Sequence, residues 1–110
     1  MNKKQFKRMR EALQTIEFSN RSGSHIGCIR LNNNCSDLHN DKIIEIAKEF
    51  NRLQIPYLTE AKFINNLGKA DIINLATHEI YEIAVSESDE SIIAKQNKYP
   101  DIFKIIKVRV

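Results

Sequence analysis

The sequence is short of several features on which common protein classes depend. It has three glycines among 110 residues and no glycine-rich phosphate loop, which argues against nucleotide-binding folds. Its longest unbroken apolar runs are three residues, far too short for a membrane span. It has two cysteines, and no apolar stretch follows the basic N-terminus to form a signal peptide. We therefore expect a cytoplasmic protein, in a reducing compartment that does not favour a Cys28–Cys35 disulfide.

The sequence is rich in branched apolar residues for one small domain. Hydrophobic residues make up 42% of the chain and charged residues 28%, which is ordinary for a globular protein. Isoleucine occurs 17 times, enough for a strand-rich core. We expect residues 1–35 to form an extension packed on a core of residues 36–110. A domain of this size buries a modest share of its surface, so a dimer interface would add stability.

Charge is distributed unevenly along the chain. Residues 1–35 hold seven Lys or Arg against two Glu, a net +5, whereas the remainder carries −2. A basic end beside an acidic body fits an arm that binds a polyanion such as nucleic acid; the alternative is an ordinary solvated helix face. The side chains expected to contact phosphates are those of Lys3, Lys4, Lys7, Arg8 and Arg10.

The spacing of apolar residues predicts an α+β fold. It predicts a helix over 3–16, a loop over 19–24, a short strand over 25–31, and a second helix that Ser36 or Asp37 caps and that stops before Pro56. Strands follow over 57–63, 69–75 and 79–85, then a helix to about Asn97 and a strand over 102–110. From Asp37 onward the order is α-β-β-β-α-β.

Acidic residues interrupt the apolar strands. Asp71 and Glu82 lie on strands that a tight turn joins, so we expect them to be neighbours in a hairpin. Buried acids are costly unless they are paired or bind a cation, and two carboxylates suit Mg²⁺ or Mn²⁺. Glu60 is a third acid, on the adjoining strand. The alternative is that all of them face solvent on the polar side of the sheet.

This order of elements, with Asp in the second strand and Glu in the third, resembles the PD-(D/E)XK nuclease superfamily. That superfamily includes restriction endonucleases and archaeal Holliday junction resolvases. The match consists of Gly68-Lys69-Ala70-Asp71, ten intervening residues and Glu82-Ile83-Ala84. The tail of the chain also resembles this superfamily, at Ser86-Glu87-Ser88 entering a helix, at Lys95 near the end of that helix and at Tyr99-Pro100 before the last strand. The resemblance covers residues 37–110, about two thirds of the chain.

The resemblance implies a restriction-endonuclease-like fold and a metal-dependent DNA endonuclease, often a homodimer. Asp71 and Glu82 would hold Mg²⁺ or Mn²⁺, with Glu60 or Glu45 as an additional acid. The family usually has a lysine two residues after the Glu, which orients the attacking water and stabilises charge on the phosphate. Here that position is Ala84.

Three explanations for Ala84 stay open. Lys95 or Lys69 replaces the missing lysine; the protein is a catalytically inactive DNA-binding module; or Ala84 itself replaces a lysine, to give an inactive protein. We interpret Ser86 as a helix cap and Glu87 as an acid matched to the helix dipole. The alternative is that Ser86 contacts a phosphate and that Glu87 assists the metal or the environment of Lys95. Tyr99 is expected to end the helix and to pack as an aromatic.

A second group of residues raises the question of zinc. His25, Cys28, Cys35 and His39 provide the four ligands that a structural zinc site needs, and a zinc-stabilised adaptor is the function that they would suggest. However, His25 and Cys28 would point to opposite faces of a strand. We therefore do not expect zinc, and favour buried thiols and surface histidines. His39 is also a candidate for contacting a phosphate.

Overall fold

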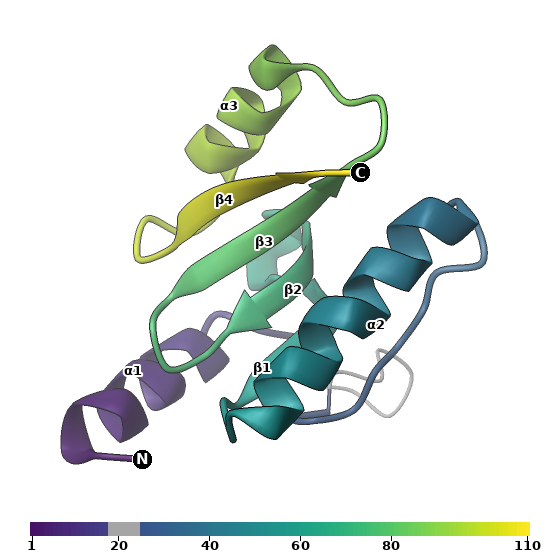
Figure 1. Cartoon of the computed structure of the whole chain (residues 1–110). Helices are drawn as coiled ribbons and strands as arrows, with labels where there is room; N and C mark the ends of the chain where they lie inside the picture. Colours follow the sequence, from purple (N-terminus) through teal and green to yellow (C-terminus); the bar gives the residue numbers. More distant parts are fainter. Residues whose placement is uncertain (18–24) are drawn as a thin grey trace.

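A four-stranded mixed sheet forms the centre of the molecule (Figure 1). The structure, a computed structural model, describes residues 1–17 and 25–110, so the loop predicted over 19–24 lies outside the described residues. The strands follow the order β1-β2-β3-β4; β3 and β4 are parallel and the other pairs are antiparallel. The strands are β1 (Tyr57–Lys62), β2 (Lys69–Asn74), β3 (Glu79–Ala84) and β4 (Lys104–Arg109).

Three α-helices accompany the sheet in the part of the chain that the structure describes. They are α1 (Lys3–Leu13), α2 (Asp37–Arg52) and α3 (Asp89–Lys98), and a short 3₁₀ turn, η1, covers Ile64–Asn66. The α-β-β-β-α-β order predicted from Asp37 onward is confirmed, and the fold is α+β. Because parallel strands need a crossover, α3 connects β3 to β4.

The helices bury the two faces of the sheet separately. Residues Ala47 and Phe50 of α2 pack on Tyr57 and Ile72. Residues of α1, the end of α3 and the sheet form a larger cluster that includes Ala12, Phe63, Ile73, Tyr99 and Phe103. The described helices include none long and apolar enough to cross a membrane.

The predicted strand over 25–31 is wrong. The segment turns at Gly27, whose φ is +77°, and then runs irregularly beside β1. Its backbone bonds partly to side chains: the Arg30 N–H donates to Thr59 Oγ1 at 2.6 Å, and the Tyr57 hydroxyl donates to the Gly27 carbonyl at 3.1 Å. These contacts replace the backbone ladder that a strand requires.

Two helix ends also differ from the prediction. α1 stops at Leu13, and Ile16 instead forms an isolated bridge with Phe63. The cap of α3 is Ser88 rather than Ser86, because Ser88 Oγ accepts a hydrogen bond from the Ser91 N–H at 3.2 Å. Glu87 therefore lies before the helix, where it is available for other contacts.

Gly68 brings the β1–β2 connection close to Tyr99. Its φ is +114°, in a region that favours glycine, and a Cβ there would lie 2.5 Å from Tyr99 Cε1. Tyr99 ends α3, is buried and packs on Phe63, so its expected role as a helix stop and packing aromatic is confirmed. This approach places the Tyr99 hydroxyl over β2 and β3.

Candidate functional site

Three acids lie at one level of the sheet. The pairs Thr59–Ile72 and Ala61–Ala70 place Glu60 opposite Asp71. The pair Ile72–Tyr81 places Asp71 opposite Glu82 in turn. Directly opposite residues of neighbouring strands are close in space, so the register brings all three predicted acids together.

The regular alternation of side chains breaks at this level. Leu58 and Ala61 of β1 belong to the same core cluster, and so do Ala70 and Ile73 of β2. A spacing of three residues cannot keep side chains on one face of a regular strand, so both strands change phase between these residues. Glu60 lies at the break in β1 and has a φ of +51°.

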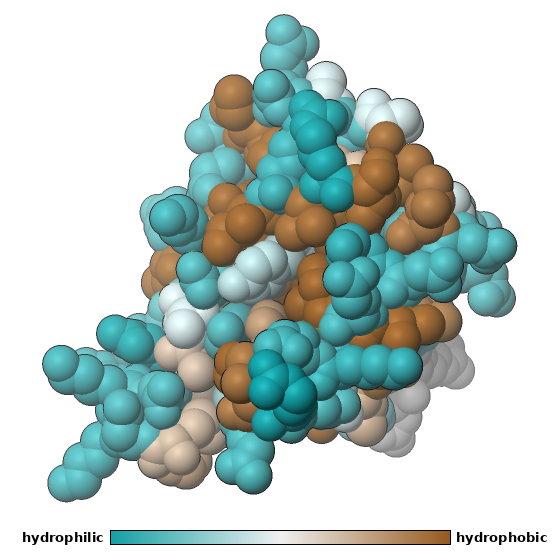
Figure 2. All heavy atoms as spheres, viewed as in Figure 1, coloured by the Kyte–Doolittle hydropathy of each residue, from teal (hydrophilic) through white to brown (hydrophobic). Residues whose placement is uncertain are grey.

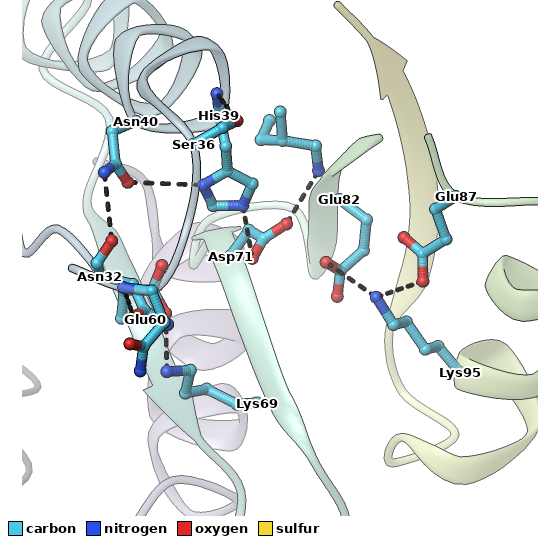
Figure 3. A network of polar contacts seen from close by, with 12 residues as sticks. Asn32, Ser36, His39, Asn40, Glu60, Lys69, Asp71, Glu82, Glu87 and Lys95 are labelled. Carbon is cyan, nitrogen blue, oxygen red and sulfur yellow. Dashed lines mark hydrogen bonds and ion pairs between the residues drawn. The ribbon is translucent and has the colours of Figure 1, made fainter. Parts of the chain in front are cut away.

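His39, Glu60 and Asp71 form the cluster that could hold a cation (Figure 3). Each offers one ligand atom, and these atoms all lie within 4.8 Å of one another. His39 Nε2 lies 3.2 Å from Asp71 Oδ1. Ser36 caps α2 by accepting from the His39 N–H at 3.2 Å, which sets the start of the helix and directs His39 toward the sheet. We call these three residues the cation cluster.

Glu60 provides the test of whether a cation fits. Its side chain is 4% exposed, and neither carboxylate oxygen accepts a hydrogen bond of good geometry within the described residues. Lys69 Nζ lies 2.9 Å from Glu60 Oε2 and is its ion-pair partner. Buried carboxylate oxygens normally have hydrogen-bond donors, so these oxygens are suited to a metal ion.

Asp71 also supports the sheet. One of its oxygens faces His39, whereas Oδ2 accepts a hydrogen bond from the Ile83 N–H at 2.8 Å. The side chain thus satisfies a backbone donor of β3 where the strands change phase. A cation at Asp71 would use the oxygen that faces the cation cluster.

Glu82 lies on the other side of Asp71, where it also contacts residues of α3 and its C-terminal cap. The Tyr99 hydroxyl donates to Glu82 Oε1 at 2.6 Å, and Lys95 Nζ lies 3.8 Å from Oε2. Burial and the neighbouring Asp71 carboxylate raise the pKa of Glu82 to about 9. In the absence of a cation Glu82 is therefore protonated at neutral pH.

Lys95 reaches Glu82 from α3. Its Nζ lies 2.7 Å from Glu87 Oε1, the closer of its two carboxylate partners. Burial opposes its charge, but the hydrogen bond to Glu87 and the negative charge of the surrounding carboxylates hold the pKa of Lys95 above its usual value. Glu87 is thus the ion-pair partner of this lysine rather than a helix-dipole acid. Ala84, where the resemblance leads us to expect a lysine, is buried on β3.

The predicted site residues separate into two groups. Asp71, Glu82, Lys95, Lys69 and Glu60 lie together, and His39 is buried among them rather than on the surface. The basic side chains of α1 are exposed elsewhere. His78 Nε2 lies 2.6 Å from the Arg8 carbonyl, which places α1 beside the β2–β3 turn.

The remaining candidates lie outside the cation cluster. Glu45 is exposed and forms an ion pair with Lys42. His25 and Cys28 are exposed, so the expectation of buried thiols is wrong for Cys28, and Cys35 is half-buried. Among the described residues the zinc quartet does not assemble, because His39 joins acids instead.

Sequence reasoning missed the hydrogen bond between Tyr99 and Glu82. These residues lie on different elements, and the crossover through α3 brings them together. The sequence signal was Tyr99 itself, an aromatic residue with a polar group that needs a partner when it is buried.

Comparison of the chain with protein-family models, curated proteins and solved structures finds no match.

Proposed function

We propose that this protein is a metal-dependent DNA endonuclease with a restriction-endonuclease-like arrangement of its core. The observation that supports this best is the cation cluster, in which the buried Glu60 carboxylate has Lys69 as its ion-pair partner and accepts no hydrogen bond of good geometry among the described residues. A buried carboxylate with so few partners, beside an Asp and a His, is costly for a purely structural site. Lys95 of α3 and Glu82 of β3 lie beside this cluster, and they would supply a positive charge for the phosphate and a further metal ligand.

The cation cluster suits a divalent metal. Asp71, Glu60 and His39 would hold Mg²⁺ or Mn²⁺, which would polarise the phosphate and activate a bound water. The imidazole of His39 favours Mn²⁺, because Mg²⁺ prefers oxygen ligands alone. Glu82, which the sequence predicts as a metal ligand together with Asp71, would become a further ligand once its carboxyl group loses its proton.

Lys95 takes the role of the family's lysine in this proposal. Its amine is held by Glu87 and Glu82 on the side of the site that faces α3. There it would stabilise negative charge on the phosphate as the bond breaks. Lys69 is less suited to this role, because it already pairs with Glu60.

The proposal is tested by cleavage of supercoiled, linear and branched DNA in Mn²⁺, Mg²⁺ or chelator. Asp71→Asn keeps an oxygen that can accept from the Ile83 N–H, so the fold should survive while cleavage falls by about 100-fold or more. The control is Asp101→Asn, an exposed acid outside the site, which should cleave like the natural protein. Cleavage that persists in chelator, or in Asp71→Asn, would contradict the proposal.

Three further variants distinguish the explanations for Ala84. Lys95→Met should abolish cleavage, whereas Lys98→Met, an exposed lysine of the same helix, should not. If neither the unchanged protein nor the two lysine variants cleave DNA, but the unchanged protein binds DNA in chelator, it is an inactive DNA-binding module. If Ala84→Lys then produces metal-dependent cleavage, the missing lysine is the reason for the inactivity.

A further inference from the structure

A pocket of about 390 Å³ opens beside the cation cluster. One wall is the segment of residues 30–34, and the other is made by Glu60, Lys62 and Lys69 of β1 and β2. The volume lies within the range of sites for small molecules, about 300–1,000 Å³. Glu60 belongs both to this pocket and to the cation cluster, so a ligand in the pocket would extend to the cation.

The wall formed by residues 30–34 is fixed in place. The Arg30 N–H donates to Thr59 Oγ1 at 2.6 Å, which ties the segment to β1. The Asn40 side chain donates to the Asn32 carbonyl at 3.1 Å, which ties it to α2. The Asn32 side chain in turn accepts from the Asn34 N–H at 2.9 Å. A preformed wall loses little conformational freedom on binding a ligand.

The groups in the pocket define the chemistry of that ligand. Lys62 and Lys69 line the pocket, and although they pair with Glu17 and Glu60 they favour a ligand that carries a phosphate. The exposed side-chain amides of Asn33 and Asn34 make no hydrogen bond within the described part of the chain, and each can donate and accept. Leu31, 43% exposed, offers an apolar surface to a flat ring. A phosphate, a ring face and a polar edge are together the features of a nucleotide.

We propose that this pocket receives the base of one unpaired nucleotide whose phosphate lies at the cation cluster. The inference rests on the proposed function, and it names the substrate class as DNA that contains an unpaired nucleotide. A base within an intact duplex is stacked and paired, and it would have to leave the helix to enter the pocket. An asparagine amide is well suited to the polar edge of a base, adenine above all.

The test compares dAMP with deoxyribose 5-phosphate, which has the same phosphate and no base. Calorimetric titrations in Mn²⁺ should give an affinity for dAMP higher by about tenfold, the value of one good contact to a base edge. The double variant Asn33→Ala/Asn34→Ala should lose most of this difference, because only the contact of the base with Leu31 remains. The control Asn51→Ala, an exposed asparagine on α2, should keep the difference. Equal affinities in the natural protein would overturn the inference.

Oligonucleotides distinguish a strand from a free nucleotide. A five-nucleotide single strand should bind more tightly than dAMP and than a blunt duplex. A strand that binds no more tightly than dAMP would overturn the assignment to DNA. The binding measurements do not depend on cleavage: preference for the base without any cleavage contradicts the proposed function alone, and cleavage without preference for the base contradicts the inference alone.

Discussion

At the scale of single residues, Glu82 makes the stability of the fold depend on pH. The pKa of its carboxyl group is about 9 in the folded protein, raised from 4.5 by burial and by Asp71. Between these two pH values the folded chain holds one proton that the unfolded chain has released. The free energy of unfolding therefore falls as pH rises through this range, by up to about 1.4 kcal/mol per pH unit.

Glu82→Gln removes this titration and keeps an oxygen for the Tyr99 hydroxyl. In chelator, we expect the variant to be more stable than the natural protein at pH 8 and to show a flatter dependence on pH. Urea unfolding at pH 5, 6, 7 and 8 measures this. The control is Glu45→Gln, since that side chain is exposed. Parallel pH profiles for Glu82→Gln and the natural protein would show that Glu82 ionises normally.

At the scale of elements, β1 carries backbone strain at Glu60. A φ of +51° in a strand is unfavourable for a glutamate and tolerated by asparagine. Glu60→Asn should therefore raise the free energy of unfolding by about 1 kcal/mol, or about 4 °C in Tm, while weakening Mn²⁺ binding. Scanning calorimetry and metal titration measure the two effects. A variant that loses stability, or that binds Mn²⁺ normally, would contradict this account of Glu60.

A matched control for this strain is Gln54→Asn. Gln54 also has a positive φ, +58°, and it is exposed after α2 and outside the cation cluster. This change relieves the backbone without removing a carboxylate. It should therefore leave Mn²⁺ binding unchanged.

The regular elements were predictable because apolar residues recur along each of them at the spacing of a helix or a strand. The strands over 57–63, 69–75 and 79–85 each end one residue earlier in the structure than in the prediction. The prediction of a strand over 25–31 was wrong for a local reason: the segment contains Gly27, which turns the chain, and several of its hydrogen-bond partners are side chains of β1. Residue spacing does not encode such contacts with a distant element.

At the scale of the whole molecule, the basic face of α1 is a separate surface from the cation cluster. Figure 2 shows hydrophilic side chains projecting where α1 lies. Lys4, Lys7 and Arg8 line a shallow pocket with His78 there.

Replacing these three basic residues with glutamine should weaken DNA binding uniformly across sequences. It should also reduce the slope of log affinity against log salt by about 2 to 3, because each phosphate contact contributes about 0.9.

Fluorescence anisotropy of labelled DNA across a range of salt concentrations measures this slope. The control replaces three exposed lysines elsewhere, Lys48, Lys98 and Lys104, and keeps the same net charge as the first variant. If both variants change the slope equally, the effect reflects overall charge rather than contact through α1.

The candidate site was predictable only where it depends on strand order. Asp71, Glu82 and Glu60 could be placed together from the hairpins alone. The position of His39 depends on how α2 packs, and that of Tyr99 on the crossover through α3. Neither packing arrangement follows from periodicity, so the histidine was assigned to the surface and the tyrosine to packing alone.

The parallel pairing of β4 has a consequence for the order of folding. The three antiparallel strands are joined by short connections, whereas β4 pairs with β3 only after α3 has crossed over. Contacts between residues close in sequence close smaller loops and form sooner. We therefore expect a transient three-stranded meander in which Asp71 and Glu82 already face each other. The amine of Lys95 arrives with the last strand, so the final folding step is also the one that assembles the complete charge set of the site.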